Sequence, residues 1–179
     1  MKNKIKKYEN KSLSNYNIFE LLNKKIRILT YPELAEYKNI YDVLSPNNSF
    51  ILLYMTGKRY GHWCCVIEHN DRIEFFDPYG DALPDDEFKY IDNNFRKISS
   101  QYYPHLTYLL YKSKKPIEYN NYNFQKKNNN IKTCGRHCVF RIANKKLLLD
   151  EYKKMLDYIR KETDMTYDEI VTYYTIKKK

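Results

Sequence analysis

Short apolar runs separated by polar turn residues occupy the middle of the chain and predict a small sheet. Residues 50–55 form one apolar run, residues 63–67 a second and residues 73–76 a third. The polar residues His69, Asn70 and Asp71 separate the last two runs, as expected for the turn of a β-hairpin. We therefore expect three strands with antiparallel pairing, and a fourth strand over residues 106–111.

Helical spacing of apolar residues flanks this region on both sides. Residues 16–24 place Ile18, Leu21 and Leu22 on one face, and Pro32 suits the first turn of a short helix that ends near residue 37. Further helices are expected within residues 85–102, over residues 134–149 as a largely buried helix, and over residues 151–160 and 167–174. The expected fold class is α+β, with a small mixed, mainly antiparallel sheet flanked by helices.

Length and composition fit one folded domain over residues 1–179. The 20 Tyr and 8 Phe residues can build a core, although Lys and Asn lower the mean hydropathy to −0.80. Basic residues gather at both ends, which predicts a loose N-terminal arm over residues 1–12 and a basic tail over residues 176–179.

The formal net charge of +10 attracts polyanions, and it fits DNA binding, acidic substrates or solubility alone. Lys, Asn, Ile and Tyr are all abundant, so an A/T-rich gene explains the charge equally well. No apolar run follows the basic N-terminus, and no stretch reaches the length of a membrane span. We expect neither secretion nor a membrane partner.

The four cysteines do not form the pattern of a disulfide framework. Cys64 and Cys65 are adjacent, and Cys134 and Cys138 are one helical turn apart, which favours free thiols in a reducing compartment. Zinc is disfavoured too, because no C-x2-C pair occurs and adjacent residues of a strand point to opposite faces. We therefore expect no bound metal.

Four residues supply the groups needed for nucleophilic acyl transfer: Cys134, His62, Asp77 and Gln125. His62 begins one strand and Asp77 ends its antiparallel partner, so hairpin pairing brings the carboxylate to the imidazole. Cys134 lies where a polar loop meets a helix, whose free N–H groups favour a thiolate and can hold an oxyanion. Other interpretations are a turn for Asp77 and a helix face of small core residues for Cys134 and Cys138.

The order of these motifs resembles the adenovirus maturation protease and its relatives among large DNA viruses, virophages and polinton-like elements. The SUMO peptidases belong to the same superfamily. The resemblance covers residues 50–143 and implies an adenain-like cysteine protease fold with the nucleophile at a helix N-terminus. The matching residues are Gly61-His62-Trp63, Phe75-Phe76-Asp77-Pro78-Tyr79-Gly80, Gln125 and Thr133-Cys134-Gly135-Arg136-His137-Cys138.

By this resemblance Cys134 is the nucleophile, His62 the general base and Asp77 the acid that orients it. Gln125 is the oxyanion donor, together with the backbone N–H of Cys134. Trp63 would border the narrow channel that accepts small residues, and Gly135 would let a second chain approach the backbone closely. The family places its Gln six or seven residues before the nucleophile, whereas Gln125 lies nine before it, so Asn128 stays an alternative donor.

The resemblance implies a viral or virophage maturation endopeptidase that cleaves capsid or other virion precursors after small, glycine-type residues. The chemistry would need no cofactor, although the adenovirus relative uses DNA and a peptide as activators. We expect a monomer in the virion and in the cytoplasm or virus factory of the host cell. Two alternatives stay open: a deconjugating peptidase for SUMO or other ubiquitin-like proteins, and a basic DNA-binding or packaging protein without catalysis.

Overall fold

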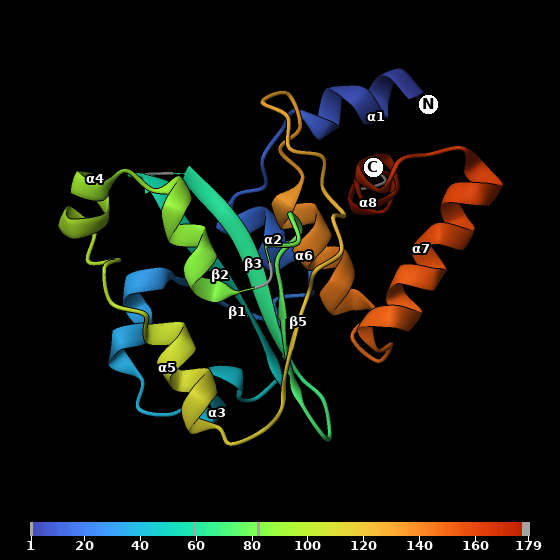
Figure 1. The fold of residues 1–179 in the computed structure, drawn as a ribbon. Coiled ribbons are helices and arrows are strands. Elements are labelled where there is room, and N and C mark those ends of the chain that lie inside the picture. The colour runs from blue at the N-terminus through green and yellow to red at the C-terminus, as the bar shows by residue number, and fades with distance from the viewer. Residues whose placement is uncertain (1, 59, 82, 177–179) are drawn as a thin grey trace.

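The computed structural model of the chain describes residues 2–58, 60–81 and 83–176. Its centre is a five-stranded sheet in the order β1-β2-β3-β4-β5 (Figure 1). β2, β3 and β4 pair antiparallel, whereas β1 pairs parallel with β2, and β5 parallel with β4. The mixed sheet and its flanking helices confirm the expected α+β class. The strands are β1 (Arg27–Thr30), β2 (Ser49–Gly57), β3 (Tyr60–Glu68), β4 (Ile73–Phe76) and β5 (Ile117–Tyr119).

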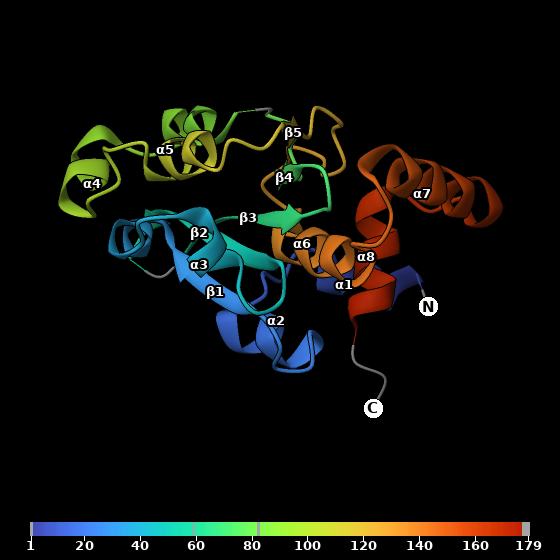
Figure 2. The ribbon, with the colours of Figure 1, turned by 90° about the horizontal axis from the view of Figure 1, so that it is seen from below.

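Helical segments cover both faces of the sheet (Figure 2). One face carries the short 3-10 helices η1 (Tyr31–Glu36) and η2 (Pro84–Tyr90) and the α-helices α3 (Ile40–Leu44), α4 (Asn93–Ile98) and α5 (His105–Lys112). The other face carries α2 (Asn15–Leu21) and α6 (Cys134–Ala143), with α1 (Lys2–Glu9), α7 (Leu149–Thr163) and α8 (Tyr167–Thr175) packed around them.

Successive residues of the central strands alternate between two hydrophobic cores, one on each face of the sheet. Cys65 faces the core that includes α6, and Cys64 faces the core that includes α3 and α5. Both thiols are fully buried. The alternation follows from the two-residue period of a strand, as expected for adjacent cysteines.

The expected strand over residues 106–111 is wrong, because this segment forms α5. Leu106, Leu109 and Leu110 are its buried residues, and their spacing is that of one helix face. The sheet is instead completed by β1 and β5, two short strands that the hydrophobic pattern did not predict. Both pair parallel to their neighbours, so neither belongs to a hairpin.

The other helix boundaries differ from expectation in three places. Residues 2–9 form α1, whose Ile5 is 2 % exposed, so most of the predicted loose arm is a helix packed against α8. The segment 85–102 divides into η2 and α4, and the helix that begins at Cys134 ends at Ala143. Of the predicted basic tail, residues 177–179 lie outside the described residues. None of the described helices has both the length and the apolar character needed to cross a membrane.

A buried ion pair fixes α6 against the sheet. Arg141 of α6 donates to both carboxylate oxygens of Glu74 on β4, with distances of 2.8 Å and 2.6 Å, and both side chains are fully buried. Such a two-point contact sets both position and rotation of a guanidinium. Because Cys134 begins the same helix, this pair also helps to place that cysteine relative to β4.

Candidate active site

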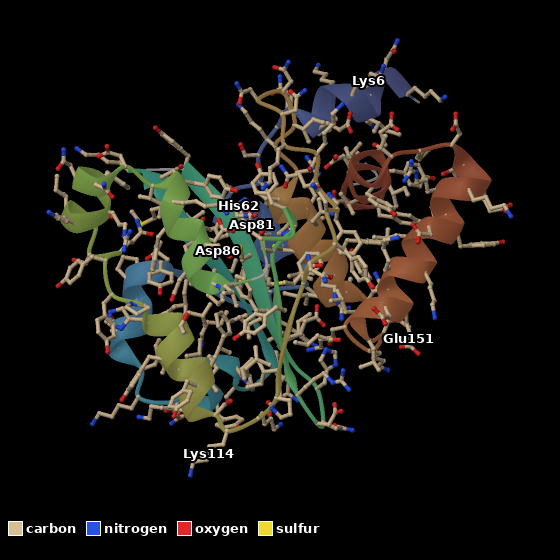
Figure 3. All side chains as sticks on the ribbon, in the orientation of Figure 1. Lys6, His62, Asp81, Asp86, Lys114 and Glu151 are labelled. Carbon is tan, nitrogen blue, oxygen red and sulfur yellow. The ribbon has the colours of Figure 1, made fainter. Side chains whose placement is uncertain are left out.

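A cavity of about 520 Å³ lies where the first turn of α6 meets the start of β3. Its walls include Cys134, His62 and Gln125, three of the four site residues expected from the sequence. The fourth, Asp77, follows β4 and is fully buried in contact with His62. The structure therefore brings all four residues together. In Figure 3, His62 and Asp81 lie near the centre of the view, whereas Lys6, Lys114 and Glu151 lie at its edges.

His62 and Asp77 form a short hydrogen bond, as the hairpin pairing of β3 and β4 predicts. Nε2 of His62 donates to Oδ1 of Asp77 at 2.6 Å. The same carboxylate accepts the backbone N–H groups of Tyr79 at Oδ1 and of Asp81 at Oδ2, at 3.0 Å and 2.9 Å. With Nε2 held in this way, Nδ1 is the imidazole nitrogen left to exchange a proton with the cavity.

The electrostatics of the pair favour a charged imidazole beside a charged carboxylate. Burial alone lowers the pKa of His62, but its acidic surroundings, with the Asp77 carboxylate in direct hydrogen bond, outweigh burial and hold that pKa well above its usual value. Burial raises the pKa of Asp77, and the opposing effects of His62 and of two backbone N–H groups bring it below the usual range. An imidazolium that forms during a reaction would therefore be stabilised here.

The ring of Tyr79 stacks on the imidazole of His62. Its hydroxyl also accepts a hydrogen bond from Nε2 of Gln125 at 3.4 Å. Tyr79 belongs to the turn after β4, in the motif that contains Asp77. No role for Tyr79 was expected from the sequence, and its position two residues after the acid is the signal for one.

Cys134 is the first residue of α6, as the sequence predicts. Trp63 packs beneath this turn, where a Cβ on Gly135 would lie 3.1 Å from the Trp63 ring. The indole donates to the carbonyl of Leu13, and Cys138 Sγ donates to the carbonyl of Trp63, each at 3.3 Å. Glycine at position 135 therefore permits the close contact between α6 and β3.

The substrate-contact roles expected for Trp63 and Gly135 stay predictions, and the structure adds where the two residues lie. Trp63 is 4 % exposed and Gly135 is buried, and neither is among the described residues that line the cavity. The indole is held in the core by its bond to Leu13, so it does not form a wall of the cavity. Gly135 lies against the ring of Trp63.

The two candidate oxyanion donors both line the cavity, but they are held differently. The Gln125 side chain is buried, its Nε2 donates to Tyr79 and to the carbonyl of Ile131, and its Oε1 has no partner among the described residues. Asn128 is exposed, and its Oδ1 caps the backbone N–H of Asn130 within the same loop. Both N–H groups of the Gln125 amide are thus occupied in this structure, so the geometry does not choose between the two donors.

Asp168 of α8 holds the loop that carries Gln125 next to α6. Its carboxylate accepts the backbone N–H of Lys126 at 3.1 Å, the Thr133 hydroxyl, and Nε2 of His137 at 3.0 Å. Burial raises the pKa of Asp168, and the hydrogen bonds, His137 foremost, bring it below the usual value. His137 is therefore bound to Asp168 in the core, as a packing role predicts, and no local sequence signal indicates the bond across 31 residues.

No protein-family model matches the chain. A curated protein of Sputnik virophage, "Uncharacterized protein V9", is 46 % identical to it over 173 residues, which cover 96 % of this chain and 98 % of that protein. The chain belongs to the same family as V9. Two solved structures of ASFV pS273R protease are 16 % and 19 % identical to the chain, with TM-scores of 0.45 and 0.46, over 93 % of the chain and 68 % of the protease. The family assignment rests on V9 alone.

One group of described residues brings metal-binding atom types together: His62, Cys64, Asp77 and Glu87, whose donor atoms all lie within 4.8 Å of one another. Two ligands of one tetrahedral zinc ion, each about 2 Å from it, lie about 3.3 Å apart. Nε2 of His62 and Oδ1 of Asp77 are only 2.6 Å apart. This arrangement fits a shared proton between the two residues better than a shared ion.

Proposed function

We propose that this chain is a cysteine endopeptidase with Cys134 as nucleophile, His62 as general base and Asp77 as the orienting acid. One observation carries the proposal. Cys134, at the start of α6, lines the same cavity as His62, whose Nε2 is bound by the buried carboxylate of Asp77 at 2.6 Å. The resemblance of the motifs to the adenovirus protease group supports the same assignment.

In the proposed acylation step, the thiolate of Cys134 attacks the carbonyl carbon of a peptide bond, and His62 gives a proton to the leaving amine. Water activated by His62 then hydrolyses the thioester. The oxyanion of each tetrahedral intermediate is held by the backbone N–H of Cys134 and the side-chain amide of Gln125. Asp77 stays ionised and stabilises the imidazolium. None of these steps calls for a metal or an organic cofactor.

We propose a capsid or other virion precursor as the substrate, cut after a small residue such as glycine. The virophage origin of V9 and the resemblance to viral maturation proteases support this choice. The enzyme would act as a monomer within the virion and in the cytoplasm or virus factory of the host cell. A deconjugating peptidase for a ubiquitin-like protein is the competing proposal within the same chemistry.

Coexpression with candidate substrates tests the proposal. The wild type, Cys134→Ala and Cys138→Ala would each be coexpressed with a virophage major capsid precursor and, separately, with a SUMO fusion. Cleavage of the capsid precursor by the wild type and Cys138→Ala, but not by Cys134→Ala, is expected. Cleavage of the SUMO fusion alone would favour the deconjugating peptidase. Cleavage of neither, by a folded wild type, would contradict the substrate proposal.

We also propose non-specific DNA binding, in the role of activator or scaffold. The supporting feature is α1, whose Lys2, Lys4, Lys6 and Lys7 are all exposed, with Lys6 pointing away from the body of the molecule in Figure 3. Mobility shifts of duplex DNA of unrelated sequences should appear at low salt and vanish at high salt. Their absence at low salt would contradict DNA binding and leave the protease proposal intact.

A further inference from the structure

A second carboxyl group, that of Glu87, lies next to the one that holds His62. Glu87 belongs to η2, on the α5 side of the sheet, and its side chain is 1 % exposed. Its carboxylate oxygen lies within 4.8 Å of the donor atoms of His62, Cys64 and Asp77. In the described part of the chain Glu87 has no Lys or Arg partner, and its Oε1 has no hydrogen-bond partner. A buried carboxyl without a cation needs another explanation for its place.

The groups around Glu87 are mostly acidic. Cys64 comes from β3, Tyr54 from β2, and Asp77 and Asp81 from the segment after β4. Burial raises the pKa of Glu87 to about 8; His62 opposes this rise, and Asp77 adds to it. Burial likewise raises the pKa of the Cys64 thiol well above its usual value. At neutral pH the ionised members of the group are therefore His62 and Asp77, which balance each other.

A neutral carboxylic acid differs from a carboxylate because it offers one O–H donor. The Asp77 carboxylate has capacity for about four hydrogen bonds. Its Oδ1 accepts from His62, from the Tyr79 backbone and, at 3.9 Å, from the Cys64 thiol, whereas its Oδ2 accepts only from the Asp81 backbone among the described residues. A further donor therefore has room at Oδ2 of Asp77, and a carboxyl oxygen of Glu87 lies within 4.8 Å of the Asp77 carboxylate.

We propose that Glu87 is a positioning residue of the site, which as a neutral acid donates its proton in a hydrogen bond to the Asp77 carboxylate. The role rests on the proposed protease function, because it acts on His62 only through Asp77. The bond fixes the acceptor that orients the imidazole. Ionised Glu87 would lose this bond and place a second negative charge against Asp77.

Three substitutions separate this role from packing. Glu87→Gln keeps the size of the side chain and an N–H donor at every pH, whereas Glu87→Leu keeps the volume and removes the donor. Asp85→Asn removes a carboxyl from the same short helix at an exposed position and serves as the control. Each variant would be compared with the wild type in the rate of Cys134 alkylation by iodoacetamide, mapped by mass spectrometry, and in thermal unfolding.

At neutral pH the rates of Cys134 alkylation in Glu87→Gln and Asp85→Asn should lie within about twofold of the wild-type rate. The rate in Glu87→Leu should be about tenfold lower, because this variant loses one hydrogen bond to a charged group. The ratio of the wild-type rate to the Glu87→Gln rate should fall above about pH 8, where Glu87 ionises. This ratio cancels the titration of the thiol itself. Equal rates for folded Glu87→Leu and Glu87→Gln, together with a flat ratio, would overturn the proposal.

Infrared difference spectra supply a readout that needs no reactive thiol and no stable Glu87→Leu variant. The carbonyl band of a protonated carboxylic acid should be equally strong in the wild type and in Asp85→Asn at neutral pH, and weaker in Glu87→Gln, where Glu9, whose pKa burial raises to about 7, still contributes. A wild-type band no stronger than that of Glu87→Gln would overturn the proposal. The proposal would also be overturned if the wild type, but not Glu87→Gln, retained zinc after dialysis against a chelator. The stronger wild-type band without any preferred alkylation of Cys134 would instead contradict the protease function and leave the hydrogen bond in place.

Discussion

The rings of Tyr79 and His62 are stacked, with centroids 4.3 Å apart and an angle of 10° between their planes. Asp77 holds one edge of the imidazole, and the phenol ring covers one of its faces. The Tyr79 hydroxyl meets the Gln125 amide, so a single side chain contacts both the proposed base and the proposed oxyanion donor. Tyr79 therefore couples two parts of the site that are 63 residues apart in sequence.

Substitution of Tyr79 separates the stack from the hydroxyl contact. Tyr79→Phe should keep the stack and leave the rate of Cys134 alkylation within about threefold of the wild-type rate. Tyr79→Ala should lower this rate about tenfold, because the imidazole loses the ring that packs on its face. Tyr111→Ala, at a side chain 83 % exposed, is the matched control. Wild-type alkylation in Tyr79→Ala would show that the stack does not orient His62.

Asp77→Asn replaces the charged acceptor with a group of the same shape. We expect the rate of Cys134 alkylation at neutral pH to fall by about 10²-fold or more, because the imidazolium loses its counter-charge and the imidazole its fixed tautomer. Asp71→Asn removes a carboxylate from an exposed site and should leave the rate unchanged. A loss of less than about threefold in folded Asp77→Asn would argue against an orienting role.

The same pair predicts how stability depends on pH. Because the folded-state pKa of Asp77 is depressed, its contribution is present above the unfolded-state pKa and lost as the pH falls through the folded-state pKa. The folded-state pKa of His62 is raised, so its contribution is present below its unfolded-state pKa and lost as the pH rises through the folded-state pKa. Urea unfolding followed by the fluorescence of Trp63, the one tryptophan, should show a shallower acid limb in Asp77→Asn. An unchanged acid limb would contradict the assignment.

The buried pair between Glu74 and Arg141 should dominate the stability of the contact between α6 and the sheet. Arg141→Met leaves the Glu74 carboxylate buried with His69 as its remaining side-chain partner among the described residues, and we expect it to lower the free energy of unfolding by about 3–5 kcal/mol. Arg72→Met, which removes the partly exposed ion pairs with Asp71 and Glu118, should cost about 1 kcal/mol or less. Equal costs in urea unfolding would contradict the structural role of the buried pair.

Local patterns predicted the elements that form the site. The apolar runs gave β2, β3 and β4, and hairpin pairing placed Asp77 beside His62 because that contact depends only on neighbouring strands. The polar-to-apolar change at Cys134 predicted the start of α6. These features share one property, which is that each is decided by residues close together in the sequence.

Features that depend on distant residues were not predicted. The run at residues 106–111 has strand-like composition, but its leucines occur at helical spacing and pack against η1 and α3, so the helix forms. β1 and β5 are short, and each is fixed by a parallel partner elsewhere in the chain. Trp63 was assigned to the cavity by resemblance, whereas in the structure its ring is buried against Gly135. Glu87 lies in an acidic run whose pattern does not separate it from exposed Asp85.

The reactivity of the four thiols tests the central claim most directly. Limiting iodoacetamide would be added to the native wild type and to His62→Ala at neutral pH, and the modified cysteines would be mapped by mass spectrometry. Cys64, Cys65 and Cys138 are fully buried, while Cys134 lines the cavity. We predict that Cys134 takes nearly all the label, and that its rate falls about 10²-fold or more in His62→Ala, since the thiolate loses its imidazolium partner. Even labelling of the four cysteines, or a Cys134 rate unchanged by loss of His62, would contradict the account.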